Sequence, residues 1–275
     1  MMIMKISHFT KVLLIGATLL MASCSPRYFV QISDPQLGFI SQNKDFNEEK
    51  KLMDVIIAEV NLLKPDMVVF SGDLVHDRNN QRQLDGFEQM CRIFSSDIPL
   101  FFVPGNHDIG NEAENEDVQK FIRRYGSDRF VYKGKGYTVI GFNSCVIKAE
   151  TEYEEAEYAW IEKQLKKTGR SKPVILVAHH PFFTKDPEEK EIYYNIKPEL
   201  RMKYLNMFQE YGVDLVLAGH MHKLADGEFE GIPFYTSGAA GKAFKDGSGV
   251  SLIEINKGQV SVKYITTDSF PIEIK

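Results

Sequence analysis

The chain has 275 residues, 43% of them hydrophobic and 26% charged. These proportions are ordinary for a soluble globular protein and differ from those of a disordered chain, collagen or a coiled coil. The length suits one sizeable domain, and the formal net charge of -5 makes a nucleic-acid duplex a poor electrostatic match.

The N-terminus has the pattern of an export signal. Lys5 and Lys11 precede an apolar run over residues 12–21, which is short for a stable membrane-spanning helix. The sequence LMASC that closes the run resembles a bacterial lipoprotein box, in which Cys24 would be lipidated and would become the new N-terminus. An ordinary secretory leader and a short uncleaved anchor are the alternatives.

The lipoprotein interpretation divides the chain into a signal peptide, residues 1–23, and a single domain, residues 24–275. The mature domain would carry a net charge of -7. The protein is then expected to be exported and lipid-anchored to a bacterial membrane, on its periplasmic or cell-surface face, with the anchor as its sole link to the membrane.

Strand and helix patterns alternate after the leader, as is typical of a layered α/β domain. In the first half, strands are predicted at 28–33, 67–70 and 100–103, and helices at 46–63, 84–94 and 118–125. In the second half, we predict a hairpin at 130–142, helices at 154–165 and 198–211, and strands at 174–178, 213–217, 232–236, 250–255 and 260–266. The stretch 185–197 is predicted to be a loop over the site.

Five of the strand patterns end in polar residues of one chemical type. These segments are Asp34-Pro35-Gln36, Gly72-Asp73, Gly105-Asn106-His107-Asp108, His179-His180-Pro181 and Gly219-His220-Met221-His222. Sites in open α/β sheets form outside the carboxyl ends of the strands, so these segments are expected to converge. Carboxylates, an amide oxygen and imidazoles are suitable ligands for divalent metals.

The use of histidine supports a metal site. Of seven histidines, one lies in the leader and the other six lie in or beside these segments. A single histidine at a strand end is usually a packing residue, but packing does not explain why all six gather at strand ends.

The ordered set of segments resembles the calcineurin-like metallophosphoesterase superfamily, over about Tyr28 to His222. The resemblance implies a four-layer α/β/β/α sandwich of two mixed β-sheets flanked by helices. It also implies two divalent or trivalent metal ions (Fe, Mn or Zn) at the strand carboxyl ends.

The resemblance further implies a role for each matched residue. Asp73 would bridge both metals, and the other ligands would be Asp34 and His222 for the first metal, and Asn106, His179 and His220 for the second. His107 would be the general acid or charge stabiliser, and Asp108 would help to orient it.

Gln36 is a departure, because most members carry Asp-x-His in the first segment. Its amide oxygen would ligate the first metal weakly or bind a metal-bound water. The sequences Asp-Pro-Gln-Leu-Gly and Gly-Asp-Leu-Val-His resemble the branch that includes eukaryotic cytosolic protein phosphatases, where such a substitution also occurs. His76 lies three residues after Asp73, where purple acid phosphatases place a tyrosine ligand. It is either a first-metal ligand or a residue of the pocket wall.

Neighbouring residues on an extended segment point in opposite directions. We therefore expect only one of His179 and His180 to face the metal. The family resemblance implies that it is His179, and His180 would then be a packing or supporting residue. The nearby aromatic residues would line a groove or, by default, pack in the core or loops; these are Phe182, Phe183, Tyr193 and Tyr194.

The expected function is hydrolysis of phosphate esters. The favoured form is a phosphomonoesterase that uses a metal-bridging hydroxide, with His107 as general acid, on a small phosphorylated substrate or a phosphoprotein. One alternative is a phosphodiesterase acting on nucleotides or lipid head groups. The other is a non-catalytic lipid-anchored binding protein on the same fold.

Overall fold

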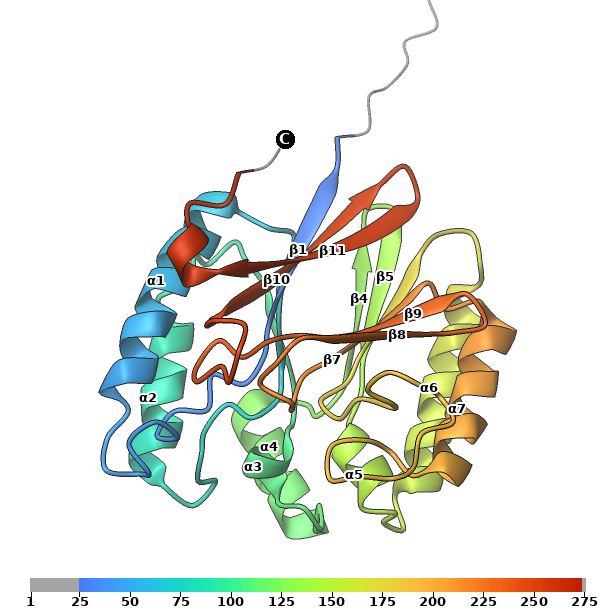
Figure 1. The fold of residues 1–275 in the computed structure, drawn as a ribbon, viewed down its shortest axis with the longest axis horizontal. Helices are drawn as coiled ribbons and strands as arrows, with labels where there is room; N and C mark the ends of the chain where they lie inside the picture. The colour runs from blue at the N-terminus through green and yellow to red at the C-terminus, as the bar shows by residue number, and fades with distance from the viewer. Residues whose placement is uncertain (1–24, 274–275) are drawn as a thin grey trace, which may run out of the picture.

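The computed structural model describes residues 25–273, so the predicted signal peptide and Cys24 lie outside the described residues. Two mixed β-sheets pack face to face, and helices cover their outer faces (Figure 1). This arrangement confirms the predicted fold class.

The first sheet has the strand order β11-β10-β1-β2-β3. Its strands are β1 (Arg27–Ile32), β2 (Val68–Ser71), β3 (Leu100–Val103), β10 (Gly249–Asn256) and β11 (Gln259–Thr266). The first three strands run parallel, whereas β10 pairs antiparallel with both β1 and β11. The carboxyl ends of β1, β2 and β3 therefore share one edge.

The second sheet has the order β4-β5-β6-β7-β9-β8. Its strands are β4 (Phe130–Gly134), β5 (Tyr137–Gly141), β6 (Val174–Val177), β7 (Leu215–Ala218), β8 (Ala225–Phe229) and β9 (Ile232–Thr236). The four central strands are parallel, so β6 and β7 also end at one edge.

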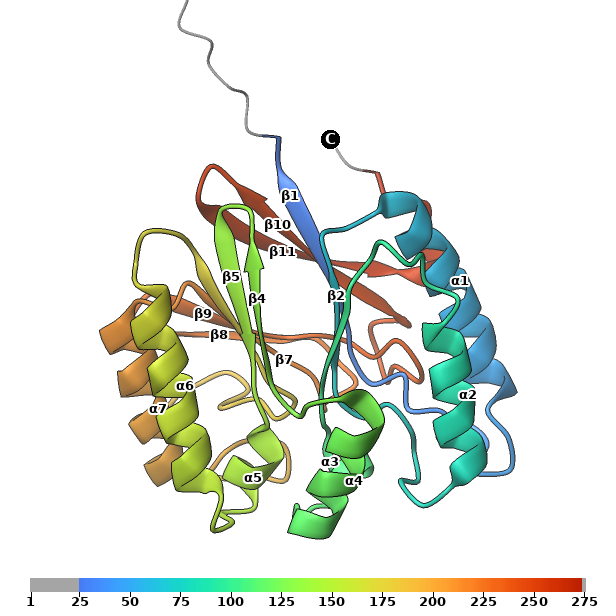
Figure 2. The ribbon, with the colours of Figure 1, turned by 180° about the vertical axis from the view of Figure 1, so that it is seen from behind.

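Helices α1 (Asn47–Leu63) and α2 (Gln81–Cys91) cover the first sheet, and α6 (Glu154–Thr168) and α7 (Pro198–Tyr211) cover the second (Figures 1 and 2). The remaining helical segments are α3 (Asn106–Ile109), α4 (Asn115–Tyr125), α5 (Ser144–Lys148) and the 3₁₀ turn η1 (Thr267–Ser269). Within residues 25–273, no helix combines the length and apolar character needed to cross a membrane.

An apolar layer fills the space between the two sheets. Phe29 and Val69 of the first sheet and Val177 and Leu217 of the second are fully buried in it. Each such side chain contributes roughly 1.5–3 kcal/mol of burial free energy. The layer holds the strand ends of both sheets in fixed relation, and the site is built on those ends.

Most predicted elements are present, but some bounds differ. Helix α2 begins three residues earlier than predicted because the Asn80 side chain accepts a hydrogen bond from the Gln83 N–H and caps the helix. The short helices α3 and α5 were not predicted, and neither was strand β8. The sequence of β8, ADGEF, has low strand propensity, and its pairing with β9 makes it a strand.

Candidate metal centre and active site

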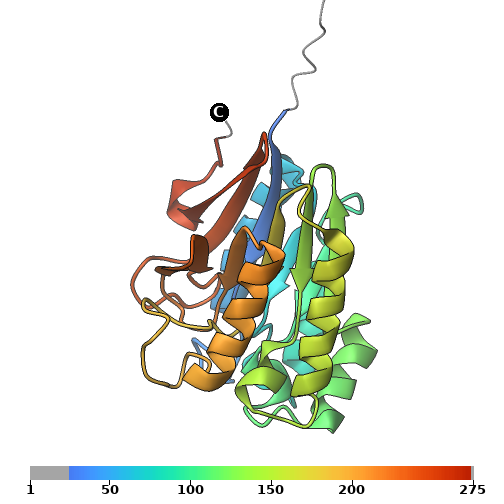
Figure 3. The ribbon, with the colours of Figure 1, turned by 90° about the vertical axis from the view of Figure 1, so that its right-hand side faces the viewer.

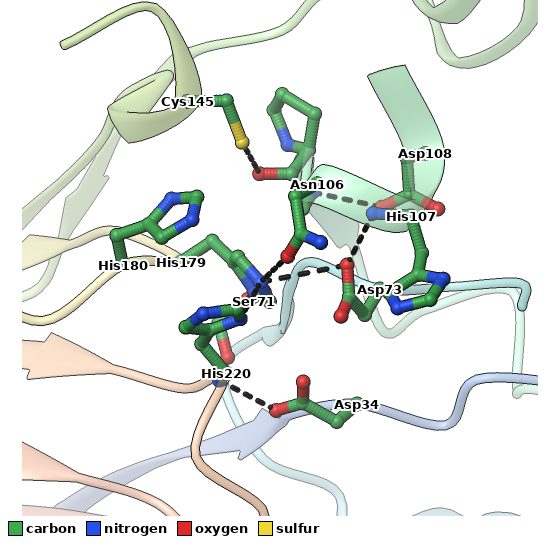
Figure 4. A network of polar contacts seen from close by, with 12 residues as sticks. Asp34, Ser71, Asp73, Asn106, His107, Asp108, Cys145, His179, His180 and His220 are labelled. Atoms are coloured by element: carbon green, nitrogen blue, oxygen red, sulfur yellow. Dashed lines mark hydrogen bonds and ion pairs between the residues drawn. The ribbon is translucent and has the colours of Figure 1, made fainter. Parts of the chain in front are cut away.

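The segments that follow the strands converge at the edge between the two sheets, and Figure 4 shows their side chains turned toward one another. Backbone hydrogen bonds join the segments directly. The Asp34 N–H donates to the Gly72 carbonyl at 3.2 Å, and the Gln36 N–H donates to the Asp73 carbonyl at 2.9 Å. In the second sheet, the Gly219 N–H donates to the His179 carbonyl at 2.9 Å.

Several of these residues have a left-handed backbone. The φ angle is positive at Asp34 (51°), Gln36 (39°), Asp73 (53°), His220 (71°) and His222 (52°). Such a conformation is uncommon for non-glycine residues and costs on the order of 1–3 kcal/mol each. Five positions in this conformation, all at predicted ligands, indicate that the chain tolerates strain here to aim the side chains.

Two glycines allow the close packing of the segments. A Cβ atom at Gly105 would lie 2.1 Å from Asp73 Oδ1, and one at Gly72 would lie 2.5 Å from His179 Nδ1. Neither contact is possible, so any larger residue would displace a predicted ligand. This explains why a glycine precedes both Asp73 and Asn106.

The predicted ligands of the second metal form a compact buried group. His179 Nε2 lies 3.1 Å from His220 Nδ1, 3.2 Å from Asn106 Oδ1 and 3.4 Å from Asp73 Oδ1. His179 Nδ1 lies 2.9 Å from the Ser71 carbonyl, which can only accept, so the proton is on Nδ1 and Nε2 presents a lone pair. Electron-rich atoms that face one another in a buried group are a fitting site for a cation.

The predicted ligands of the first metal lie beside this group. His222 Nδ1 is 2.7 Å from the Lys242 carbonyl, which leaves His222 Nε2 facing Asp34 Oδ1 at 3.4 Å. Within the described chain, Asp34 Oδ1 and Gln36 Oε1 are buried without a hydrogen-bond partner. Buried polar atoms are rarely left unpaired, so these two oxygens also fit a metal or its bound water.

The electrostatics agree with a cation at this place. Burial would lower the pKa of His222, but the Asp34 carboxylate outweighs it and raises that pKa to about 9. At His220, burial and the neighbouring His179 hold the pKa well below its usual range. The Asp34 carboxylate thus attracts a positive charge, while His220 stays neutral and available as a ligand.

His107 stands next to the metal group with one ring nitrogen already engaged. Its backbone N–H donates to Asp73 Oδ1 at 2.8 Å, and its Nδ1 lies 2.7 Å from the His76 carbonyl. Because a carbonyl only accepts, Nδ1 carries a proton and Nε2 is the nitrogen left to face a substrate. The geometry fits the predicted role of His107.

Asp108 joins two segments of the site by hydrogen bonds. One carboxylate oxygen accepts the N–H groups of Leu74 (2.9 Å) and Val75 (3.4 Å), and the other accepts the Gly105 N–H (2.8 Å). Asp108 is thus a positioning residue that fixes the Asp73 segment against the His107 segment.

His76 packs in the pocket wall. Its ring stacks on His107, with centroids 4.8 Å apart, and lies 5.0 Å from the Phe39 ring. It belongs to neither of the candidate metal-binding groups among the described residues. The same holds for the predicted ligand His222, and His76 Nδ1 is buried without a hydrogen-bond partner in the described chain. The stacking agrees with the pocket-wall interpretation, which stays a prediction.

His180 lies closer to the metal group than the sequence suggested. Its ring is 4.5 Å from that of His220, and it forms a compact group with His179 and His220. Strand β6 ends at Val177 and the chain bends at both histidines, so the alternation of an extended strand does not apply to them. That His180 supports the site without binding the metal stays a prediction. Ser144, which the sequence analysis missed, accepts the N–H groups of both histidines at 3.0 and 2.9 Å. No motif marked it.

The nearby aromatic residues divide into two pairs. Phe182 and Phe183 are buried in the core, as the default predicted. Tyr193 instead reaches the site, where Asn106 Nδ2 donates to its hydroxyl at 3.3 Å. Tyr194 lies 5.5 Å from the His220 ring. The loop over residues 185–197 therefore covers part of the site, as predicted.

A sandwich of two mixed sheets with carboxylate, asparagine and histidine ligands at its strand ends defines a class of metal-dependent hydrolases. A profile of the calcineurin-like phosphoesterases matches residues 28–224. The chain belongs to this family and is a phosphoric ester hydrolase. Members of the family use a dinuclear metal centre, and the buried ligand groups fit one.

Three similar proteins illustrate the relation. The Danio rerio "Serine/threonine-protein phosphatase CPPED1" is 30% identical over 88% of this chain and 85% of its own. The Arcobacter nitrofigilis "Probable glycerophosphodiester phosphodiesterase GpdQ" is 28% identical over 71% of this chain and 72% of its own. The solved structure of a dimetal phosphatase from Danio rerio has a TM-score of 0.66 and 12% identity, over 88% of this chain and 96% of that one, which supports the fold alone.

Proposed function

We propose that the protein is a phosphomonoesterase in which two metal ions are held by the predicted ligands and His107 acts as general acid. The observation that carries this proposal is the convergence of His179 Nε2, Asn106 Oδ1, Asp73 Oδ1 and His220 Nδ1, with His107 bonded to the same aspartate. The 88% coverage shared with the CPPED1 phosphatases supports monoesters as substrates.

The metals, when bound, would neutralise the charge on the phosphate and activate water as the nucleophile. We propose Fe, Mn or Zn, because all three accept mixed oxygen and nitrogen ligands. Asp34, Gln36 and His222 would hold the first, Asn106, His179 and His220 the second, and Asp73 both.

The chain's own residues supply the remaining chemistry. His107 Nε2 would donate a proton to the departing oxygen, while the His76 carbonyl holds Nδ1 and stabilises the charged ring. Asp108 keeps His107 aligned through the Gly105 N–H. The substrate would be a small phosphorylated molecule or a phosphoprotein.

The first test is His107→Ala with two substrates of different leaving groups. Loss of a general acid should lower kcat for an alkyl phosphate by about 10²–10⁴-fold. A nitrophenyl phosphate, whose leaving group needs little protonation, should suffer much less. The measurement is steady-state kinetics on protein with verified metal content and circular dichroism. Equal losses on both substrates would contradict the general-acid role.

A phosphodiesterase is the second candidate, because of the similarity to GpdQ. Parallel assays with a nitrophenyl monoester and a bis-nitrophenyl diester separate the two. We expect a higher kcat/KM for the monoester, and the opposite order would assign the site to diesters.

We also propose that the mature protein is exported and anchored by a lipid on Cys24, a residue outside the described part of the chain. The described chain starts at the end of the molecule opposite the strand carboxyl ends (Figure 1). An anchor there would direct the site away from the membrane surface and toward soluble substrates, which favours these over lipid head groups.

A further inference from the structure

Two exposed aromatic side chains lie directly against predicted metal ligands. Tyr193 is 58% exposed and Phe244 is 56% exposed. The Tyr193 ring centroid lies 5.1 Å from that of His220, and the Phe244 ring stacks on His222 at 5.0 Å with 18° between the planes. The rings therefore border both halves of the metal centre, where they remain in contact with solvent.

Phe244 does not stand alone. Phe39 lies 6.3 Å from it in an edge-to-face arrangement and contacts His222 at 5.3 Å. Lys242 Nζ lies 5.3 Å above the Phe39 ring and brings a positive charge to this side. Apolar rings next to a cation suit a substrate with a flat apolar part and an anionic part.

The loop that carries Tyr193 is braced from within. Arg201 of α7 is fully buried, and its guanidinium donates to the carbonyls of Pro187 (2.7 Å) and Glu189 (2.6 Å). The Glu189 side chain accepts the Thr184 N–H at 2.7 Å and Asn195 Nδ2 at 2.6 Å. An exposed ring on such a loop is held in place before a ligand arrives, which lowers the entropic cost of binding.

Tyr193 and His107 also line one cavity. The cavity has a volume of about 350 Å³, and Asn106 and His76 form part of its wall. A group that leaves toward His107 Nε2 would thus depart beside the Tyr193 ring. The loops that carry Tyr193 and Phe244 project from the same side of the molecule (Figures 1 and 3).

We propose that Tyr193 and the Phe39–Phe244 pair are specificity residues that receive an aromatic ring bonded directly to the phosphate. Aryl phosphate monoesters, with phosphotyrosine side chains as the protein example, are then the preferred substrate class. This inference rests on the proposed phosphomonoesterase activity. In the reaction, the bond between phosphorus and the phenolic oxygen breaks and an oxygen from water bonds to phosphorus. The phenolic oxygen takes a proton, so water and aryl phosphate give phenol and phosphate.

The test compares two peptides of one sequence, one with phosphotyrosine and one with phosphoserine. Phenols are better leaving groups than alcohols, so wild type alone is uninformative. The measured quantity is kcat/KM for the phosphotyrosine peptide divided by kcat/KM for the phosphoserine peptide. This ratio is determined in Tyr193→Ala and in Phe244→Ala and is compared with that of wild type. We expect the ratio to fall about three- to tenfold in each variant, as the loss of one aromatic contact implies. Leu62→Ala, a truncation at an exposed position of α1, is the matched control and should leave the ratio unchanged.

Tyr193→Phe distinguishes ring recognition from an effect through Asn106. It keeps the ring and removes the hydroxyl that Asn106 contacts, so the ratio should stay within about twofold of wild type. Equal losses on both peptides in Tyr193→Ala would overturn the inference while leaving the phosphomonoesterase intact. Adenosine monophosphate is assayed as a third substrate. If the two alanine variants lose activity toward it alone, the rings bind a nucleobase and the inference is also overturned. Wild type that hydrolyses no monoester would instead refute the proposed function.

Discussion

Gln36 is the residue at which this metal centre differs from the common family pattern. Its side chain is buried, and within residues 25–273 its Oε1 has no hydrogen-bond partner. An unpaired buried amide oxygen costs about 1–3 kcal/mol of stability. A bound metal ion or its water would offset this cost by pairing with the oxygen. His76, the other candidate for the missing imidazole, has its ring against Phe39 and His107 instead.

The two residues predict different metal contents. Gln36→Ala should weaken binding of the first metal about tenfold or more, since it removes an oxygen from that ion or from its water. His76→Ala should retain both metals, because its ring packs in the wall of the pocket. Metal titration followed by elemental analysis measures both effects. Loss of one metal equivalent in His76→Ala, with Gln36→Ala unchanged, would make His76 the ligand.

Helix α6 shows how an element far from the metals supports the site. Its Glu157 is buried and accepts the Asn143 N–H at 2.9 Å and Arg129 Nη1 at 2.7 Å. Asn143 immediately precedes Ser144, the residue that holds His179 and His180. The helix thereby fixes the segment beneath two histidines of the centre.

Glu157 also makes the stability of the fold depend on pH. Burial raises the pKa of Glu157 from 4.5 to about 7, against the opposing effect of Arg129. Between these values the folded protein keeps a proton that the unfolded chain has released, so this contribution to stability is lost as pH rises. From pH 5 to pH 7 the unfolding free energy should fall less in Glu157→Gln than in wild type. The two falls should differ by on the order of 2–3 kcal/mol.

Denaturant titrations at several pH values give this difference directly. Glu162→Gln on the same helix is the matched control, because Glu162 is only partly buried and its pairing with Lys166 lowers its pKa instead of raising it. If Glu157→Gln keeps the pH slope of wild type in this window, the buried carboxyl is not its source.

At the scale of the whole molecule, strand β1 sets the orientation of the site. It runs from Arg27 to Ile32, a length of about 20 Å at 3.3 Å per residue, and Asp34 follows its far end. A lipid on Cys24 would therefore attach at one end of the molecule while the metal centre lies at the other.

Lipidation is tested by growing an expressing bacterium with a labelled fatty acid. The wild-type chain should incorporate the label and Cys24→Ser should not. Cys91→Ser, which alters a cysteine of α2, is the control and should remain labelled. Incorporation by Cys24→Ser would place the modification elsewhere, and an unlabelled wild type would remove the anchor from the proposal.

The sequence alone determined most of the order of strands and helices, because alternating periodicity and strand-end motifs are local properties; α3, α5 and β8 carry no such pattern. It also identified Asp34, Asp73, Asn106, His179 and His220 as neighbours, since parallel strands that end at one edge must bring their following residues together.

Tertiary structure alone decided the position of Tyr193, the stacking of His76 on His107 and the nearness of His180 to His220. Each depends on how a loop folds after its strand has ended, where no side-chain period applies. Ser144 likewise became a support for two histidines only when the first residue of α5 came to lie beside the segment that follows β6. Contacts between segments far apart in sequence have no local signal, so they arise only from the packing of the two sheets and their loops.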